Sequence, residues 1–255
     1  MQEVKAKKYL GQHFLTDENT ALRITEALDK KDRVLEIGAG MGVLTKYLIP
    51  AVNDFKVVEI DTESVQYLYN AYPSLSDKII EGDFLKLSLS EVFNGEHFAL
   101  IGNFPYNISN LILFKVFDNR EIVDQVVGMF QKEVALRITA QKGSKTYGIL
   151  SVLLDAFYER SYLFSVSNTL FNPPPAVQSA VITLKRKNDV TLGVNTEDFV
   201  RVVKAAFNHR RKMLRQSLKS LQKDLTDVDE KFLTLRPEQM DTQDFINLTR
   251  MIYHE

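Results

Sequence analysis

The sequence predicts an α/β protein in which a Rossmann-like domain with a mostly parallel sheet precedes a small all-helical domain. Three observations support this prediction. An apolar strand leads directly into a glycine-rich turn and an apolar helix, as at the start of a nucleotide-binding α/β unit. The next two predicted strands also end in acidic residues. From residue 196 onward the apolar pattern is helical and contains no strand signal.

Composition excludes several classes of protein. The 255 residues are 45% hydrophobic and 25% charged, as in an ordinary globular protein with one large domain and room for a small one. Cysteine is absent and the four histidines lack metal-ligand spacing, so no metal site is predicted. No apolar run approaches the roughly 20 residues of a membrane span, and no signal-peptide pattern begins the chain. We therefore expect a cytoplasmic protein without a membrane partner.

The first elements lead to the glycine turn. Thr16 and Asp17 can cap a helix that runs to about Leu28, after a loop over residues 11–15. Residues 33–37 read as a buried strand, followed by Gly38-Ala-Gly-Met-Gly42 and a helix over residues 43–49. Glycines are needed where the backbone turns tightly and a ligand approaches closely. The G-x-G-x-G spacing differs from that of dinucleotide binders, and no Lys-Ser/Thr follows, which excludes a Walker-type loop.

Two further strand ends carry acidic residues. The strand over residues 56–60 brings Glu59 to the position from which ribose hydroxyls are bound, about 20 residues past the glycines. The strand over residues 78–81 precedes Asp83, which can accept from an adenine amino group, and Phe84, which can pack nearby. Each acidic residue alone is more simply a cap or a solvated turn residue. Three successive strand ends favour a ligand site at the carboxyl edge of the sheet.

The most informative stretch follows the strand over residues 98–101. Pro105 restricts its own φ and that of Phe104, so the neighbouring carbonyls have defined directions. Asn103 adds an amide oxygen, and Tyr106 adds a flat face for stacking. Together they suit a flat heterocycle that carries an amino group. The alternative is an ordinary strand-to-loop turn with a capping Asn and a half-buried Tyr.

The remaining pattern completes the α/β domain. It predicts a helix ending near residue 117, strands over residues 123–130, 158–166 and 179–184, and helices over residues 131–137 and 147–154. Three consecutive prolines, at residues 173–175, form a stiff extended loop before the last strand. Phe171 beside them is either a second aromatic wall opposite Tyr106 or an ordinary core residue.

A polar linker at residues 185–193 separates the predicted domains, residues 1–187 and residues 188–255. The second contains helices over residues 199–221, bent near residues 208–209, and over residues 227–232 and 237–252. Between residues 199 and 223 the chain has eight basic and no acidic residues, although its net charge is −1. This favours contact with phosphate backbones over the alternative of a solvated face.

Several motifs resemble one enzyme family. Glu36-Ile-Gly-Ala-Gly-Met-Gly42 resembles the E-x-G-x-G-x-G signature of S-adenosylmethionine-dependent methyltransferases. Asn103-Phe-Pro-Tyr106 resembles the motif of those that methylate exocyclic amines of bases. With Gly11-Gln-His-Phe-Leu15, Phe171-x-Pro-Pro-Pro-x-Val-x-Ser-Ala180 and Ala206-Phe-Asn-His-Arg-Arg-Lys-x-Leu-Arg215, the chain resembles the ribosomal RNA adenine dimethyltransferases over residues 7–220.

The resemblance implies a Rossmann-like S-adenosylmethionine-dependent methyltransferase domain with a seven-stranded mostly parallel sheet, its last strand reversed. It implies dimethylation of two adjacent adenines in the 3′-terminal hairpin loop of 16S rRNA, late in small ribosomal subunit assembly. Since no exposed apolar stripe stands out, we expect a monomer. The implied cofactor contacts are His13, Leu15, Gly38, Gly40, Glu59, Ile60, Asp83, Phe84 and Asn103. The implied catalytic residues are Asn103, Phe104, Pro105, Tyr106 and Phe171. The implied RNA-binding residues are Lys7, Lys8, Arg210, Arg211, Lys212 and Arg215.

Two departures from the family pattern are visible, and three other functions compete. His13 stands where many relatives have Asn, and Phe104 stands where Leu is common. The close alternative is a large-subunit rRNA methyltransferase of the macrolide-resistance type. The chain could also act chiefly as an assembly factor, with methylation as a release step. A nicotinamide-dependent oxidoreductase is disfavoured by the glycine spacing.

Overall fold

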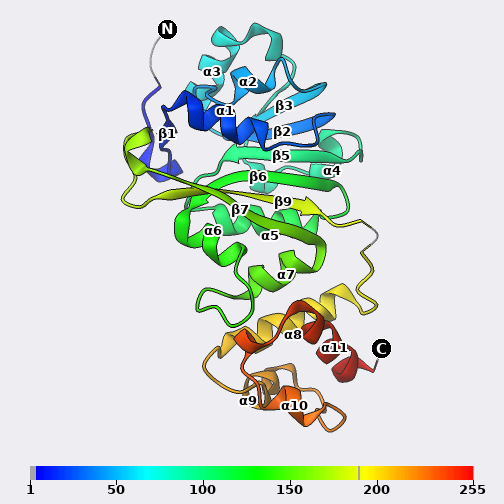
Figure 1. Cartoon of the computed structure of the whole chain (residues 1–255). Helices are drawn as coiled ribbons and strands as arrows, with labels where there is room; N and C mark the ends of the chain where they lie inside the picture. Colours follow the sequence, from blue (N-terminus) through cyan, green and yellow to red (C-terminus); the bar gives the residue numbers. More distant parts are fainter. Residues whose placement is uncertain (1–3, 189, 255) are drawn as a thin grey trace. The chain divides into compact units, whose positions relative to one another are not determined.

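The computed structural model describes residues 4–188 and 190–254, which divide into two compact units (Figure 1). The first unit holds the chain up to Ala135 together with Arg160–Arg186. The second holds Leu136–Glu159 together with the chain from Lys187 onward. The contacts thus group an internal segment with the C-terminal helices. The boundary between residues 187 and 188 stays a prediction.

A seven-stranded sheet forms the centre of the first unit, in the order β4-β3-β2-β5-β6-β9-β7. The first five of these strands are parallel, and β9 runs antiparallel to β6, so the expected reversal of the last strand is confirmed. The strands are β2 (Arg33–Ile37), β3 (Asp54–Glu59), β4 (Ile79–Glu81), β5 (Phe98–Asn103), β6 (Val123–Gln131), β7 (Tyr158–Val166) and β9 (Ser179–Arg186).

Successive strand residues point to opposite faces, and both faces of the central strands are buried. One face contributes Val34, Val57, Ile101 and Val127 to a core shared with α1 (Glu18–Glu26), α2 (Thr45–Leu48) and α3 (Thr62–Ala71). The other helices that lie wholly or partly in this unit are α4 (Leu89–Val92), α5 (Ser109–Asp118) and α6 (Lys132–Ile138). Its 3-10 turns are η1 (Lys8–Leu10), η2 (Pro73–Leu75), η3 (Phe84–Lys86) and η4 (Asn168–Leu170).

A small second sheet was not foreseen from the sequence. Strand β1 (Phe14–Leu15) pairs antiparallel with β8 (Phe171–Asn172), and Leu15 lies opposite Phe171. Both segments were expected to be loops, because two-residue strands show no alternating pattern. The pairing ties the N-terminal segment to the chain just before the three prolines.

Helix ends follow their caps. The carboxylate of Asp17 accepts the Thr20 N–H at 2.7 Å, which confirms the predicted start of α1. The prediction of a continuous helix over residues 237–252 was wrong at its start. Pro237 begins only a 3-10 turn, η6 (Pro237–Gln239), and α11 (Thr242–Tyr253) starts after a reciprocal cap between Asp241 and Asp244.

The second unit is helical. It contains α7 (Ile149–Phe157), α8 (Thr196–Asn208), α9 (Leu214–Ser217), η5 (Leu218–Leu221), α10 (Glu230–Leu233), η6 and α11. Helix α8 packs against α7 and α11, and the ring of Phe207 stacks on Phe245 at 5.7 Å. The chain leaves α8 at Asn208, which confirms the predicted break in the basic segment.

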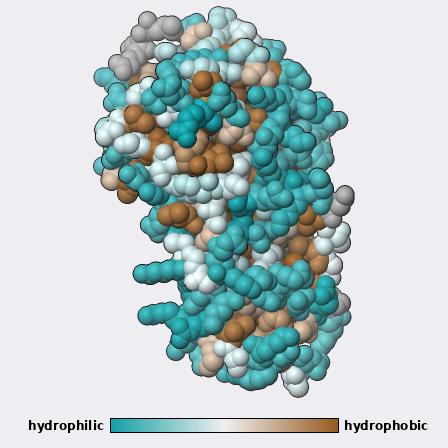
Figure 2. Space-filling model, viewed as in Figure 1, coloured by the Kyte–Doolittle hydropathy of each residue, from teal (hydrophilic) through white to brown (hydrophobic). Residues whose placement is uncertain are grey.

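The face of the molecule drawn in Figure 2 is mainly hydrophilic and is broken by apolar patches.

Candidate active site

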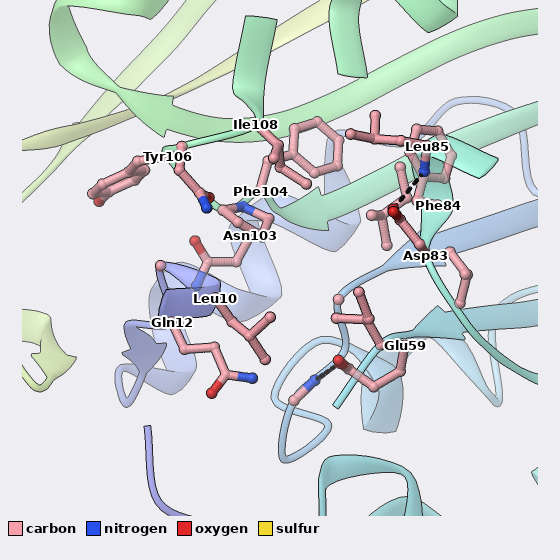
Figure 3. Close-up of a pocket in the computed structure, with 18 of the residues that line it drawn as sticks. Leu10, Gln12, Glu59, Asp83, Phe84, Leu85, Asn103, Phe104, Tyr106 and Ile108 are labelled. Atoms are coloured by element: carbon pink, nitrogen blue, oxygen red, sulfur yellow. Dashed lines mark hydrogen bonds between the residues drawn. The ribbon is translucent and has the colours of Figure 1, made fainter. Parts of the chain in front are cut away.

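A cavity opens at the carboxyl ends of β2, β3, β4 and β5, where a doubly wound sheet binds its ligands (Figure 3). It encloses about 930 Å³ of non-atom space, a figure that includes its open mouth. Of the predicted residues, its walls contain His13, Gly38, Gly40, Glu59, Ile60, Asp83, Phe84, Asn103, Phe104, Pro105 and Tyr106.

The glycine turn after β2 requires its glycines. Gly38, Gly40 and Gly42 have φ values of +69°, +56° and +79°, in the left-handed region that side chains disfavour. At Gly40 a Cβ atom would also lie 2.8 Å from the ring of Phe14. The backbone can therefore pass close to the cavity only because no side chain is present.

Two buried carboxylates support this turn. Glu36 accepts the Thr45 hydroxyl at 2.7 Å, and burial raises its pKa to about 8. Glu59 accepts the N–H of Gly40 and the N–H of Asp61, both at 2.9 Å. Burial raises the pKa of Glu59, and these backbone bonds oppose that rise. Glu59 thus joins the glycine turn to the end of β3, while each of its oxygens keeps a second lone pair.

Asp83 has one oxygen engaged in the fold. Its Oδ1 accepts the Leu85 N–H at 2.9 Å and so caps the 3-10 turn after β4. Beside it in the cavity wall lie the buried ring of Phe84 and the side chain of Ile60, which is 49% exposed. The cavity wall thus offers an acceptor together with two apolar side chains. This suits the amino edge of a flat base.

The amide of Asn103 is anchored by the N-terminal segment. Its Nδ2 donates to the His13 carbonyl at 2.8 Å. The two ends of an amide group point in different directions, so this bond fixes the direction of the acceptor oxygen. Figure 3 shows Asn103 and Tyr106 near one another, with Glu59 and Asp83 farther along the cavity.

The ring of Phe104 is packed in the core behind the site. The residue as a whole is 1% exposed, and its ring packs edge-on against Phe130 at 5.0 Å. The paired glycines Gly102 and Gly128 make room for it, since a Cβ at either position would lie within 3 Å of the ring. Phe104 borders the cavity, and the expected role of its carbonyl stays a prediction that a Phe in place of Leu does not contradict.

The ring beside Tyr106 is that of His13. The two rings stack at 5.6 Å, with 27° between their planes. Tyr106 is hydrogen-bonded to the Ser179 hydroxyl, and the His13 Nδ1–H donates to the Pro173 carbonyl at 2.8 Å. Burial raises the pKa of Tyr106.

The structure does not bring Phe171 to the cavity. Phe171 is 3% exposed and belongs to the same core as Leu15, its partner in the small sheet. Phe171 is therefore an ordinary core residue, which was the second of the two interpretations that the sequence allowed. Leu15 lines only a smaller adjoining hollow, together with Gly38 and Asn103.

A polar clamp holds the N-terminal segment, and sequence reasoning missed it. The Lys7 ammonium pairs with Asp61 and Glu63, and Gln12 donates to Asp61 at 3.2 Å. Burial would raise the pKa of Asp61, but hydrogen bonds from Lys7, Gln12 and Ser64 bring it below its usual value. The charge of Lys7 is therefore engaged within the fold. The clamp brings Leu10 and Gln12 to the cavity, where Asn107 and Ile108 are further unforeseen wall residues.

The other predicted RNA-binding residues differ in their availability. Arg210 donates to the Ser144 carbonyl at 3.1 Å, and Arg215 pairs with Glu230. Lys8, Arg211 and Lys212 are exposed, and their side chains have no partner within residues 4–188 and 190–254.

Among residues 4–188 and 190–254, no group of three His, Cys, Asp or Glu side chains could hold a metal ion. Over the same ranges, no helix has the length and apolar character needed to cross a bilayer.

The sheet order, the reversed last strand and a cavity that joins a glycine turn to an Asn-Phe-Pro-Tyr segment define a Rossmann-like methyltransferase. A family model described as ribosomal RNA adenine dimethylase matches residues 3–236. The chain belongs to this family, whose members are S-adenosylmethionine-dependent methyltransferases.

Individual relatives agree. A protein from Flavobacterium johnsoniae, named ribosomal RNA small subunit methyltransferase A, is 53% identical over 99% of this chain and 97% of its own length. One of the same name from Bacteroides thetaiotaomicron is 51% identical over 99% of this chain and 96% of its own.

Solved structures share the fold. A dimethyladenosine transferase from Plasmodium falciparum superposes with a TM-score of 0.79 at 25% identity, over 92% of this chain and 96% of its own. The 23S rRNA methyltransferase ErmE gives a TM-score of 0.69 at 24% identity, over 94% and 99% of the two chains, and shows a common fold alone.

Proposed function

We propose that this chain dimethylates the 6-amino groups of two adjacent adenines in the 3′-terminal hairpin loop of 16S rRNA, with S-adenosylmethionine as methyl donor. It does so in the cytoplasm, as a monomer, late in small-subunit assembly. Family membership and the small-subunit name of its relatives support the substrate. The observation that carries the chemistry is the Asn103 amide, anchored to His13 in the wall of a nucleotide-type cavity.

The cavity residues fit the cofactor. Glu59 retains lone pairs for ribose hydroxyls, and Asp83 retains one carboxylate oxygen for an adenine amino group. Ile60 and Phe84 supply apolar walls for the flat ring, and Gly38 and Gly40 let the ligand approach the backbone. When bound, S-adenosylmethionine supplies an electrophilic methyl group.

The protein's task is to prepare the nucleophile. The lone pair of an adenine amino group is delocalised into the ring and attacks poorly. If the Asn103 oxygen and the Phe104 carbonyl accept its two hydrogens, the nitrogen becomes more tetrahedral and its lone pair is directed. No general base is required, because the nitrogen loses its proton after transfer, when it is far more acidic. Catalysis then comes from orientation and electrostatics.

Tyr106 provides the stacking face for the flipped base. The centroids of the His13 and Tyr106 rings are 5.6 Å apart, which leaves too little room for a base between them, since each stacked pair needs a centroid separation of about 4.5–7 Å. We expect the His13 ring to move outward when adenine enters, which its single hydrogen bond to Pro173 permits. Phe171 would have to leave the core to serve as a second wall.

The exposed cations suit the RNA backbone. Lys8 begins the turn η1, whose last residue, Leu10, lines the cavity. Arg211 and Lys212 lie in the turn between α8 and α9. Such unpaired cations release counterions when they bind phosphates, so RNA affinity falls with salt.

The test is methyl transfer from labelled S-adenosylmethionine to unmethylated small subunits, with mass spectrometry of the product nucleosides. Dimethyladenosine in 16S rRNA is the expected product. Label in large subunits instead would identify the macrolide-resistance activity. The Asn103→Ala protein and naked rRNA serve as controls, and absence of transfer to any of the substrates would refute the enzymatic function.

An assembly role is compatible with the exposed turn that carries Arg211 and Lys212. It predicts that the Asn103→Ala protein still binds immature small subunits and delays their maturation. Sedimentation profiles of cells that produce this variant distinguish the two roles. A normal profile would leave methylation as the function of the chain.

A further inference from the structure

One aromatic side chain stands out at the surface. Tyr9 is 76% exposed, and it is the only aromatic among the strongly exposed large apolar side chains of residues 4–188 and 190–254. Single exposed apolar residues are common and need no explanation by themselves. Tyr9 is of interest because of its position beside the cavity.

Tyr9 is held next to the cavity. It is the middle residue of η1, and the following residue, Leu10, lines the cavity wall. Gly11 closes this turn in the left-handed conformation, with its N–H bonded to the Lys8 carbonyl at 3.0 Å. Gly11 also lies against Asn107, since a Cβ there would be 2.8 Å from the Asn107 oxygen.

The clamp of Lys7 and Gln12 on Asp61 fastens both sides of η1 to the end of β3. Tyr9 is thus presented outward by a backbone that is fixed at the cavity's edge. A fixed platform loses little conformational entropy when it binds a ligand.

The surroundings of Tyr9 are positively charged. Lys5 and Lys8 are exposed in the segment that precedes it, and residues 4–16 contain no acidic residue. The cation of Lys7 is already neutralised by Asp61 and Glu63. An exposed aromatic ring beside exposed lysines is the combination with which proteins bind single-stranded nucleic acid.

We propose that Tyr9 is a stacking platform for the unpaired nucleotide next to the target adenine. This rests on the proposed function. When one adenine leaves the loop to enter the cavity, its neighbour loses a stacking partner and must lie near the cavity mouth. Base–aromatic stacking tolerates any base, so one platform can hold either adenine while the other reacts. Lys8 would contact the phosphate between them.

The test compares Tyr9→Ala, Tyr9→Phe and wild type in steady-state methylation of small subunits. Tyr9→Ala should raise KM for subunits about 10-fold, and Tyr9→Phe should behave as wild type, because stacking needs the ring and not the hydroxyl. Equilibrium dialysis should give unchanged S-adenosylmethionine binding for both variants. Tyr69→Ala, on the partly exposed face of α3, is the matched control and should be neutral.

An unchanged KM for Tyr9→Ala would overturn the proposal, and so would a Tyr9→Phe variant as impaired as Tyr9→Ala. Equal loss of cofactor binding and of subunit affinity would assign Tyr9 to the cavity wall instead. If wild type itself methylates no small subunits, the proposed function fails. The platform is then refuted with it, whereas a Tyr9 result within an active enzyme concerns the platform alone.

Discussion

The cavity of the first unit and the basic turn of the second differ in how completely their polar groups are engaged. At the cavity, Glu59, Asp83 and Asn103 each form hydrogen bonds that fix their orientation. In the turn after α8, Arg211 and Lys212 extend from the surface without partners in the described chain. The difference indicates that hydrogen bonds within the fold fix the orientation of side chains where the chemistry depends on that orientation. Charge alone suffices where a phosphate backbone is to be held.

The largest effect is expected from Asn103→Ala. It removes the oriented acceptor, and we expect kcat to fall by about 100- to 1000-fold, as when one preorganised group is lost from other active sites. S-adenosylmethionine binding should change little, which equilibrium dialysis checks. Turnover within threefold of wild type would refute the orientation account. Asn103→Asp provides the control, because it keeps an acceptor oxygen but loses the Nδ2 bond to His13.

Gly128→Ala tests whether packing behind the site fixes the Phe104 carbonyl. The new Cβ would lie 2.4 Å from the Phe104 ring and 2.6 Å from the Phe130 ring. Overpacking of this kind costs about 1–3 kcal/mol of unfolding free energy, and displacement of Phe104 should also lower kcat. Adding Phe104→Leu should restore part of both losses, because Leu vacates the space. Chemical denaturation and turnover measure the effects; additive losses in the double variant would exclude this coupling.

Substitution of the basic residues after α8 tests whether exposed cations without partners hold the RNA backbone. Arg211→Ala combined with Lys212→Ala should make the slope of log affinity against log salt shallower by about 1.5, since two phosphate contacts are lost. Arg210→Ala and Arg215→Ala should change that slope less, because Ser144 and Glu230 already engage these side chains. Filter binding of small subunits at several salt concentrations gives the slopes. Equal changes of the slope for all four residues would show that a contact within the protein does not reduce the contribution of a cation to RNA binding.

The same contrast explains what the sequence could predict. The sequence predicted correctly that Glu59, Asp83 and Asn103 lie at one site. Parallel strands bring their carboxyl ends to the same edge of the sheet, so residues at these ends come together independently of the loop conformations. The motif resemblance added the reversed last strand. The partners of long cations could not be predicted, because Lys7 finds Asp61 and Arg215 finds Glu230 only after folding. Phe171 was ambiguous because its burial depends on a two-residue strand pairing with no sequence pattern.

Glu36→Gln tests stability rather than turnover, through a carboxyl buried beneath the glycine turn. Its pKa is raised to about 8 in the folded chain, against 4.5 without burial. Between these values the folded state keeps a proton that the unfolded state releases. Glu36 therefore weakens the fold as pH rises from about 4.5 to about 8. Gln keeps the shape and can still accept the Thr45 hydroxyl.

The variant should match wild type below about pH 4.5, where Glu36 is protonated in both states. Near pH 8 it should be more stable by several kcal/mol, since the pKa rises from 4.5 to about 8 and each pKa unit corresponds to about 1.4 kcal/mol. Glu18→Gln is the control with the opposite sign. Hydrogen bonds from Lys46 and Tyr47 lower the pKa of Glu18, so its loss should destabilise the protein above that pKa and not below it. Thermal unfolding from pH 5 to pH 8 measures the effect of Glu36, and unfolding at lower pH, down through the pKa of Glu18, measures the control. A constant difference between Glu36→Gln and wild type from pH 5 to pH 8 would mean that Glu36 is ionised throughout and that the turn rests on a buried charge.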